Sequence, residues 1–363
     1  MYPALSVLQA LIPGNEAGTD VSVLWVGSEK GMEADLVKRA GVPYCAIPAA
    51  GVHGVGLRAL PRNLLQLGRG FLAARRVLGK FRPDVLLFTG GFVAAPLALA
   101  ARLPVRGLRR PRSLVYIPDI EPGWALKFLI RFSDHVALTT ADSRAFLPAS
   151  ARATVTGYPV RADLLGWDRS DAFLTLNLNQ DLPVLAILGG SKGAHSINQA
   201  VFNHLPVVLE TMQVVHLTGQ LDWEGAEKIL QTLPEALKNR YHPYAYLHHE
   251  IGAVLASADV VLSRAGASTL GELPLFGIPA ILVPYPYAWR YQHLNADYLV
   301  ERGAAVLVKD AELASKILPV LQGMMSDPER REKMTSAMRT LAKPQAAREI
   351  ANFLIEMVPG TIK

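Results

Sequence analysis

Residues 182–205 read LPVLAILGGSKGAHSINQAVFNHL, and this stretch says most about the architecture of the chain. Its first part, PVLAIL, is a continuous apolar run with the length of a buried strand. Two glycines and a serine follow, and the residues after them place apolar side chains at helical spacing. A buried strand, a glycine turn and a helix in this order begin a β-α-β unit on a parallel sheet.

Strand-like and helix-like stretches alternate on both sides of this unit. The strand-like segments before it lie at 21–27, 43–48, 84–91, 113–119, 134–140 and 153–159. Those after it lie at 213–219, 244–249, 258–266, 277–286 and 304–310. Helix-like stretches between them include residues 1–11, 32–41, 64–81 and 94–103. This alternation predicts two doubly wound α/β domains.

The pattern restarts near GYPVRADLLGW, at residues 157–167, so we place a domain boundary there. We expect an N-terminal domain over 1–157 and a C-terminal domain over 158–343. Residues 344–363 end in a helix whose apolar stripe needs a partner, and the stripe consists of Ile350, Phe353, Leu354 and Met357. We expect this helix to pack back on the N-terminal domain.

The net charge of +6 is concentrated in the first part of the chain. Residues 1–150 hold 18 Lys and Arg against 10 Asp and Glu, whereas the remainder holds 19 against 21. A basic surface suits nucleic acid, an anionic membrane or an anionic substrate. The chain has no motif that reads RNA or DNA and no interleaving of aromatic and basic residues, so we expect no nucleic-acid partner.

Apolar runs and cysteines exclude further classes. No run approaches the ~20 residues of a membrane span, and the start lacks a basic-then-apolar signal segment, so we expect a cytoplasmic protein. The single cysteine, Cys45, excludes an internal disulfide and a multi-cysteine metal site. We also find no Asp-x-Asp pair or His/Asp cluster that would hold a metal.

The glycine turn at 189–194 suits a phosphate. Backbone N–H groups at the start of a helix carry partial positive charge, and small residues let a ligand approach them. The residues that form this turn are Gly189, Gly190, Ser191 and Gly193. A tight strand-to-helix turn without a ligand is the alternative.

A second motif, SRAGASTLGE at 263–272, follows another strand. Residues 266–269 open a helix, and the carboxylate of Glu272 could accept hydrogen bonds from two ribose hydroxyls. As an alternative, Glu272 could only complement the helix dipole. Gln292 and Asn295 lie three residues apart on one helical face, where their amides suit sugar hydroxyls or simply meet solvent.

Several motifs together resemble those of one enzyme family. Besides the two above, the chain contains FTGGFVAAPLALAA at 88–101, GYPVR at 157–161, GIPAILVPYP at 277–286 and QHLNA at 292–296. In this order they resemble the motifs of the MurG-type glycosyltransferases. The resemblance implies the GT-B fold, with two Rossmann-like domains facing a cleft. It also implies transfer of N-acetylglucosamine from UDP to undecaprenyl-diphospho-muramoyl-pentapeptide, which forms lipid II for peptidoglycan.

The resemblance assigns the first domain to the lipid-linked acceptor and the membrane, and the second to UDP-N-acetylglucosamine. Gly90, Gly91 and Phe92 are implied to form part of an acceptor-facing loop, and backbone near His248 to contact uracil. The other residues implied to bind the donor are Arg161, Gly189, Gly190, Ser191, Gly193, Arg264, Ala267, Ser268, Thr269, Leu270, Gly271, Glu272, Gln292 and Asn295. No cofactor is implied, because helix N-termini and Arg161 offset the charge that develops on UDP. A peripheral position on the inner face of the cell membrane is also implied.

The chain departs from the family pattern in two places. It begins directly after the point where the family has a GGTGGH-like loop, so we expect a late start that omits a strand and this loop. In addition, YIPDIEPG at 116–123 stands where the family has HEQNxxPG. The histidine of the GGTGGH-like loop, which the resemblance implies to act in catalysis, is absent, so we take Asp119 or Glu121 as the base that deprotonates the acceptor. A simple turn is the alternative.

The helix-like stretch at 57–81 is both basic and apolar. An amphipathic helix of this kind can lie on an anionic lipid surface, or its leucines can pack on the sheet while its arginines meet solvent. For the whole protein we expect an inverting, metal-independent glycosyltransferase. The alternatives are a transferase with another lipid acceptor such as diacylglycerol, a UDP-N-acetylglucosamine 2-epimerase, and a non-catalytic protein that binds a UDP-sugar.

Overall fold

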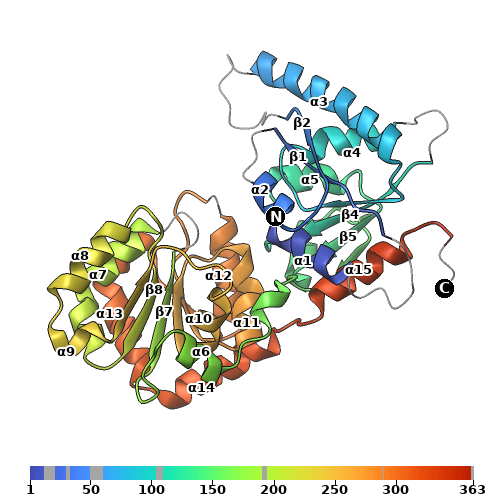
Figure 1. Ribbon diagram of the computed structural model, residues 1–363. Helices are drawn as coiled ribbons and strands as arrows, with labels where there is room; N and C mark the ends of the chain where they lie inside the picture. The colour runs from blue at the N-terminus through green and yellow to red at the C-terminus, as the bar shows by residue number, and fades with distance from the viewer. Residues whose placement is uncertain are drawn as a thin grey trace. The chain divides into compact units, whose positions relative to one another are not determined.

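The computed structural model describes residues 1–11, 21–29, 33–49, 60–103, 109–189, 194–288 and 290–360 (Figure 1). The chain forms two compact units. The first unit contains Met1–Pro159 together with Gln345–Lys363, and the second contains Val160–Pro344. In both units, all pairs of neighbouring strands among the described residues are parallel.

The described strands of the second unit form one parallel sheet in the order β12–β11–β10–β7–β8–β9. Its central strands consist mainly of Val, Leu and Ile, and residues such as Ile187 and Leu262 are fully buried because helices cover both faces. The strands are β7 (Val184–Leu188), β8 (Gln213–Leu217), β9 (Tyr241–Tyr244), β10 (Val260–Ser263), β11 (Ala280–Leu282) and β12 (Ala305–Leu307).

Helices of the second unit lie on the two faces of this sheet (Figure 1). On one face α7 packs against α13, and on the other α10 packs against α6. The α-helices are α6 (Arg169–Thr175), α7 (His195–Leu209), α8 (Trp223–Thr232), α9 (Glu235–Lys238), α10 (Ile251–Ser257), α11 (Glu272–Phe276), α12 (Tyr291–Glu301), α13 (Leu313–Met325) and α14 (Pro328–Thr340). Short 3-10 helices are η2 (Ala162–Leu164), η3 (Ala267–Leu270) and η4 (Asp310–Glu312).

The described strands of the first unit belong to two parallel sheets. One pairs β1 (Trp25–Ser28) with β2 (Tyr44–Ile47). The other has the order β3–β4–β5–β6 and consists of β3 (Val85–Phe88), β4 (Arg112–Ile117), β5 (His135–Leu138) and β6 (Ala153–Val155). The expectation that a first strand is absent concerns residues ahead of Met1, so it stays a prediction.

The last helix, α15 (Ala346–Glu356), packs against α1 (Tyr2–Leu11) in the first unit. Ile350 and Leu354 are buried there, and the Phe353 ring lies 4.4 Å from the His135 ring of β5. The remaining helices of this unit are α2 (Glu33–Arg39), α3 (Leu60–Phe81), α4 (Ala94–Arg102), α5 (Trp124–Ile130) and the 3-10 helix η1 (Ala141–Phe146). Within the described ranges, no helix is long and apolar enough to cross a membrane.

One expected strand is displaced. The sequence pattern predicts a strand at 244–249, but β9 ends at Tyr244, so this prediction is wrong by several residues. Tyr241 anchors the observed strand, because its ring is buried and its hydroxyl lies 3.1 Å from Nδ1 of the buried His216. Tyr246 and His248, which alternate like strand residues in the sequence, are both exposed.

Candidate functional site

The strand order of the second unit reverses between β7 and β10. From β7 the chain continues to β8 and β9 on one side, and then returns to β10, β11 and β12 on the other. In α/β sheets a nucleotide binds outside the carboxyl ends of the strands at such a reversal. Gly189 follows β7 directly and Arg264 follows β10 directly. The fold therefore brings both sequence motifs to the place where a nucleotide would bind.

The motif after β7 is described only in part. Gly189 is buried, and its N–H donates to the Leu217 carbonyl at 3.3 Å, which ties the loop to the end of β8. The phosphate contacts predicted for three other residues of the loop lie outside the described residues, and these are Gly190, Ser191 and Gly193. The structure is described again from residue 194, just before α7.

The motif after β10 folds as η3 followed by α11. The Thr269 hydroxyl donates to the Gly266 carbonyl at 2.6 Å and closes the turn. Ala267 and Ser268 are half-buried, whereas the next three residues, Thr269, Leu270 and Gly271, are buried. Side-chain contacts to a nucleotide can therefore come from the first residues of the motif and from Glu272, and the buried residues can contribute only backbone groups.

Glu272 begins α11 in surroundings that hold little water, although part of the residue reaches the surface. Burial raises the pKa of its carboxyl from the usual 4.5 to about 7. A hydrogen bond with Ser268 and the charge of Arg161 lower this pKa, while the charge of Asp163 raises it. A poorly hydrated carboxylate gains more from new hydrogen-bond donors than a hydrated one does, and two ribose hydroxyls are such donors.

The raised pKa of Glu272 predicts a pH dependence of stability. A carboxyl whose pKa is higher in the folded than in the unfolded protein stabilises the fold below its unfolded pKa, and this stabilisation is lost as the pH rises through the folded value. Between pH 5 and pH 8 the wild type should therefore lose about 2 to 3 kcal/mol relative to Glu272→Gln, which cannot ionise. Chemical denaturation of both proteins across this range measures the difference, and parallel profiles would contradict the raised pKa.

Arg161 and His249 lie on either side of Asp163, close to Glu272. The Arg161 Nε atom is 3.6 Å from Asp163 Oδ1, and the His249 Nδ1 atom is 3.3 Å from Asp163 Oδ2. The exposed His248 is in edge contact with the Tyr246 ring at 4.7 Å. The basic side chains of Arg161 and His249 thus lie beside the acidic pair of Glu272 and Asp163, in an arrangement that suits a nucleotide.

Arg264, Gln292 and Asn295 have defined protein partners. Arg264 donates to Asp310 at 2.5 Å, and the Gln292 Oε1 atom accepts a hydrogen bond from the Tyr285 N–H at 2.8 Å. Asn295 is fully buried and donates to the Ala265 carbonyl at 3.1 Å. The alternative that Asn295 belongs to a solvated face is therefore wrong. Its amide instead supports the backbone of the motif after β10.

On the first unit, the predicted acceptor loop follows β3. Gly90 and Gly91 have φ values of 103° and 88°, a conformation that glycine adopts far more readily than other residues. They turn the chain towards α4 and leave Phe92 59% exposed. Trp124, at the start of α5, is 56% exposed, and Lys127 lies 5.7 Å from its ring centre.

The two candidate bases of the loop after β4 have different surroundings. Glu121 is buried, with its side chain 1% exposed, and it accepts a hydrogen bond from Lys127 at 2.5 Å. Asp119 is half-buried, and its carbonyl accepts a hydrogen bond from the Ser143 hydroxyl at 3.3 Å. Tyr116 is buried, and its hydroxyl pairs with Thr139 at 2.7 Å. The tyrosine that stands in place of the first histidine of HEQNxxPG is therefore part of the core.

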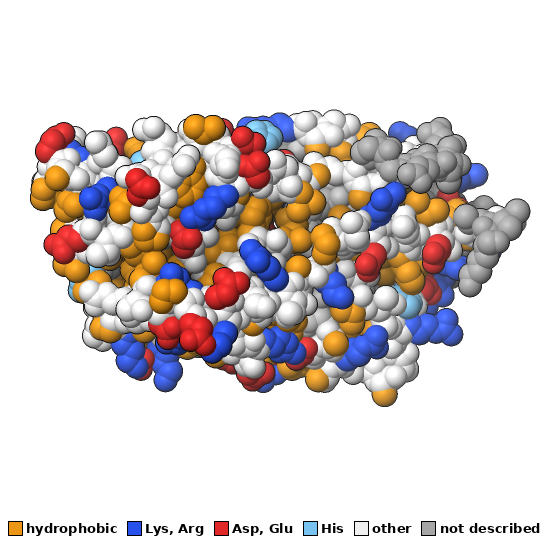
Figure 2. All heavy atoms as spheres, turned by 90° about the horizontal axis from the view of Figure 1, so that it is seen from below, with side chains coloured by type: hydrophobic (Ala, Val, Ile, Leu, Met, Phe, Trp, Pro, Cys, Tyr) orange, Lys and Arg blue, Asp and Glu red, His pale blue; other side chains and the backbone are white. Residues whose placement is uncertain are grey.

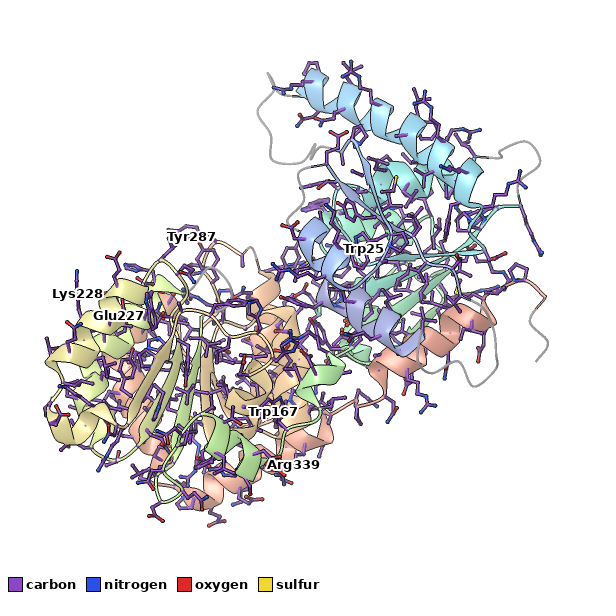
Figure 3. All side chains as sticks on the ribbon, in the orientation of Figure 1. Trp25, Trp167, Glu227, Lys228, Tyr287 and Arg339 are labelled. Carbon is purple, nitrogen blue, oxygen red and sulfur yellow. The ribbon has the colours of Figure 1, made fainter. Side chains whose placement is uncertain are left out.

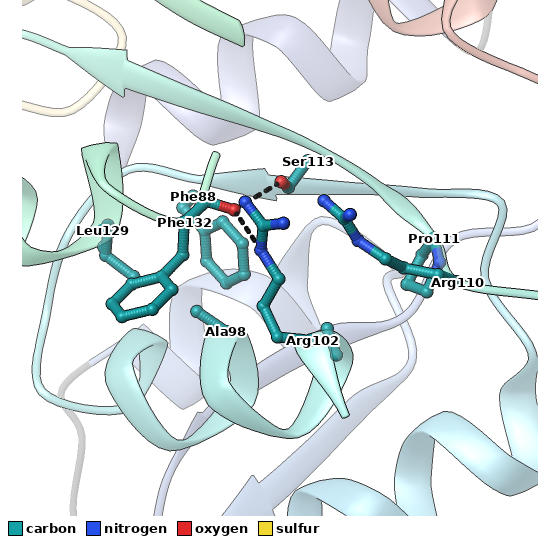
Figure 4. A pocket seen from close by; sticks show the side chains of 9 residues that line it. Phe88, Ala98, Arg102, Arg110, Pro111, Ser113, Leu129 and Phe132 are labelled. Atoms are coloured by element: carbon teal, nitrogen blue, oxygen red, sulfur yellow. Dashed lines mark hydrogen bonds between the residues drawn. The ribbon is translucent and has the colours of Figure 1, made fainter. Parts of the chain in front are cut away.

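A small hollow in the first unit lies at the opposite edge of its sheet, near the start of β4 (Figure 4). The Arg102 Nε atom donates to the Phe132 carbonyl at 2.9 Å, and the Ser113 hydroxyl donates to the same carbonyl at 3.4 Å. Arg110 pairs with Asp134 at 2.7 Å. Because substrates of α/β sheets bind at the carboxyl ends of the strands, we do not assign this hollow to the reaction. No three His, Cys, Asp or Glu side chains in the described ranges could together hold a metal ion.

Three groups near the site were not predicted from the sequence. Asp163 lies two residues after the arginine of GYPVR, and Asp310 follows the last strand of the second unit. A carboxylate just after a strand is a signal that could have found Asp310. Ser196 contacts both Arg264 and Asp310. No signal in the sequence distinguishes this serine from others at a helix start.

Two models of glycosyltransferase family 28 match the chain. The model of the N-terminal domain matches residues 1–109, and the model of the C-terminal domain matches residues 184–350, including both strands that flank the reversal. Together these matches span more than half of the chain. The class of protein is therefore a two-domain glycosyltransferase.

Known relatives narrow this class. A UDP-N-acetylglucosamine–N-acetylmuramyl-(pentapeptide) pyrophosphoryl-undecaprenol N-acetylglucosamine transferase from Roseiflexus sp. (strain RS-1) is 38% identical over 410 residues, which cover 98% of this chain and 92% of the relative. The crystal structure of MurG from Acinetobacter baumannii superposes with a TM-score of 0.73 at 25% identity, and covers 98% of this chain and 95% of that one. The chain belongs to the MurG family, and the predicted GT-B fold is confirmed.

A third similar structure shares the fold alone. The UDP-N-acetylglucosamine 2-epimerase from Neisseria meningitidis, solved with UDP-N-acetylglucosamine bound, has a TM-score of 0.67 at 14% identity. The superposition covers 98% of this chain and 96% of that one. An identity of 14% shows a shared fold and gives no evidence that this chain catalyses the reaction of the epimerase.

Proposed function

We propose that this protein transfers N-acetylglucosamine from UDP-N-acetylglucosamine to the lipid-linked diphospho-muramoyl-pentapeptide, and so forms lipid II for peptidoglycan. The observation that carries the proposal is that Gly189 and the motif after β10, which ends at Glu272, follow the two strands that flank the reversal in the second unit. The name of the Roseiflexus relative describes the same transfer.

The proposed reaction inverts the anomeric carbon without a metal ion. An acceptor hydroxyl loses its proton to a base and attacks the anomeric carbon, while the bond to the UDP oxygen breaks and the electron pair leaves with UDP. The developing negative charge is offset by Arg161 and by the N–H groups at the start of α7. Glu272 holds the ribose, and backbone near His248 contacts the uracil.

We propose Asp119, rather than Glu121, as the base. Glu121 is buried and already paired with Lys127, so taking up a proton would break this contact. Asp119 is half-buried at the carboxyl end of β4, where a substrate of this sheet would bind. The test measures the rate of UDP release by Asp119→Asn. A rate equal to that of the wild type would show that Asp119 is not the base.

The proposed acceptor is anchored in lipid, and α3 offers a surface for lipid. Arg62, Arg69 and Arg76 recur every seven residues and are exposed. Between them Leu65 and Leu72 are 59% and 57% exposed, and the segment 60–83 contains no Asp or Glu. Positions at this spacing share one face of a helix. A basic face that includes leucines is typical of helices that lie on anionic lipid, so we propose that α3 binds the membrane surface.

The opposite face of α3 packs on its own unit through Ala74 and Leu78, which are buried, and the helix contacts α4. The alternative that all its leucines pack on the sheet is therefore wrong for Leu64, Leu65 and Leu72. The face of the molecule drawn in Figure 2, in contrast, carries acidic and basic side chains interspersed among apolar ones. Acidic side chains among basic ones weaken the attraction of a surface for anionic lipid.

Release of UDP tests the proposed function. The protein is incubated with UDP-N-acetylglucosamine, with and without the lipid-linked muramoyl-pentapeptide, and free UDP and the lipid product are measured. We expect UDP release that depends on this acceptor and equals the amount of lipid product. UDP release that occurs only with diacylglycerol would show that diacylglycerol, and not the lipid-linked muramoyl-pentapeptide, is the acceptor. A changed sugar still attached to UDP would identify an epimerase, and binding without either product would identify a non-catalytic protein.

A further inference from the structure

Arg264 is held beside the strand reversal by three protein groups. Its Nη1 atom donates hydrogen bonds to Asp310 Oδ1 at 2.5 Å and to the Val283 carbonyl at 3.2 Å, and its Nη2 atom donates to Ser196 Oγ at 2.7 Å. The Ser196 hydroxyl donates in turn to Asp310 Oδ1 at 2.7 Å. One guanidinium group thus joins the segments that follow β10, β11 and β12 to the first turn of α7.

These contacts use only part of the hydrogen-bonding capacity of Arg264. A guanidinium has five N–H donors, and the described contacts with Asp310, Val283 and Ser196 occupy three of them. The Tyr285 ring centre lies 5.3 Å from the guanidinium carbon, and the Arg264 side chain remains 15% exposed. Among the residues that the structure describes, two donors therefore remain for a ligand, and the guanidinium that carries them is held in place and still reaches the surface.

We propose that Asp310 is a positioning residue which, together with Ser196, holds Arg264 so that its two remaining N–H donors bind the diphosphate of the nucleotide donor. This inference rests on the proposed function. Two donors of one guanidinium match two phosphate oxygens. A side chain that is already fixed loses little conformational freedom when the ligand binds. Asp310 acts through Arg264 and does not itself contact the donor.

A second ion pair of the same unit provides a matched control. Arg169 contacts both carboxylate oxygens of Asp259 at 3.1 and 3.0 Å, and Asp259 also accepts a hydrogen bond from the Val184 N–H at 2.8 Å. Asp259 precedes β10 and Val184 begins β7, so this pair lies at the amino edge of the same two strands. Both pairs join an arginine to an aspartate, but only the Arg264 pair lies at the edge where a nucleotide would bind.

The test compares UDP with uridine, which lacks the phosphates, by calorimetry and by competition. In Asp310→Asn we expect the Kd for UDP to rise about fivefold to tenfold and the Kd for uridine to change less than about twofold. Arg264→Gln should weaken UDP binding at least as much. Because Asp310 acts through Arg264, the double variant should bind UDP no more weakly than Arg264→Gln alone. Asp259→Asn should lower thermal stability and leave both Kd values unchanged.

Several outcomes would overturn the inference. An equal loss of UDP and uridine binding, or additive effects in the double variant, would show that Asp310 supports the fold in general. If Asp310→Asn fails to fold, Ser196→Ala tests the same contacts, and an unchanged ratio of the two Kd values would be decisive against it. If the wild type and Asp310→Asn bind UDP with the same Kd, this inference is overturned and the proposed function is not. A wild type that binds neither ligand overturns the proposed function as well.

Discussion

Replacing Glu272 by alanine should raise the Kd for UDP at least tenfold and up to about a hundredfold, which is about 1.4 to 2.7 kcal/mol of binding free energy. The carboxylate lies in surroundings where burial raises its pKa to about 7, so it has few water molecules to satisfy it. Hydrogen bonds from ribose hydroxyls to a carboxylate contribute more than bonds between neutral groups. The alanine variant removes both acceptor atoms at once.

A control separates this role from a simple interaction with the helix dipole. Glu224 occupies the first turn of α8 in the same unit and is exposed. Glu224→Ala should lower stability by a few tenths of a kcal/mol and leave the Kd for UDP unchanged. If Glu272→Ala behaves in the same way in calorimetry and thermal melts, Glu272 serves only the helix and not the ribose.

The affinity of the wild type for UDP-N-acetylglucosamine should also increase between pH 6 and pH 8, because Glu272 ionises in this range. The ionised carboxylate accepts hydrogen bonds through both oxygens and binds hydroxyls more strongly than the protonated carboxyl, which uses one oxygen as a donor. With a pKa of about 7, it is mostly protonated at pH 6 and mostly ionised at pH 8. The intact nucleotide sugar is the better ligand for this measurement, since UDP has a phosphate that itself titrates near pH 6.

The fold could be predicted from the sequence because its signals are local. The run that becomes β7 is apolar without interruption, and Ile187 within it is fully buried in the structure. The same holds for β10, where Leu262 is fully buried. Neighbouring residues thus contain enough information to identify a strand, and the alternation of strands and helices then fixes the class of sheet.

The partners of site residues could not be predicted, because they come from distant parts of the chain. Asp310 is 46 residues from Arg264, and Ser196 is 68 residues from it. No periodicity connects positions so far apart. The pairing of Glu121 with Lys127 spans only six residues, but a half-exposed lysine in a short helix gives no sign that it covers a buried carboxylate.

Local patterns also failed where strand and loop residues look alike. Residues 244–249 alternate like a strand, yet β9 ends at Tyr244, and the residue that buries its ring and contacts His216 is Tyr241 at its start. The sequence of α3 also does not distinguish exposed arginines from half-buried ones. Arg75 is half-buried whereas its neighbour Arg76 is exposed, and only the structure separates the two.

Reversing the charge of Arg69 and Arg76 together should lower the binding of the protein to vesicles with anionic lipid by about a hundredfold at low salt. Each basic residue near an anionic surface contributes about 1 kcal/mol, and Glu in place of Arg turns that attraction into repulsion. Both arginines are exposed on the face of α3 that also carries Leu65 and Leu72. Neither substitution removes a buried side chain, so the thermal stability should remain close to that of the wild type.

The matched control reverses the same amount of charge on the second unit. Lys228 extends from α8 (Figure 3) and Arg330 is exposed in α14. Lys228→Glu with Arg330→Glu should bind vesicles much more strongly than the α3 variant does, because these residues lie outside the proposed lipid surface. Sedimentation with vesicles of phosphatidylglycerol and phosphatidylcholine measures the bound fraction. Equal losses in the two variants would show that only the net charge matters.

The leucines of α3 provide the second half of this prediction. Leu65→Ser with Leu72→Ser retains every charge but removes apolar surface that would enter the lipid, and each buried leucine contributes about 2 kcal/mol. If α3 lies in the interface between lipid and water, this variant should bind vesicles weakly even at low salt. Binding of the wild type should instead weaken as salt is added, because salt screens its arginines. A wild type that stays in the supernatant with anionic vesicles at low salt would contradict the role of α3, and the acceptor would then have to reach the protein by another surface.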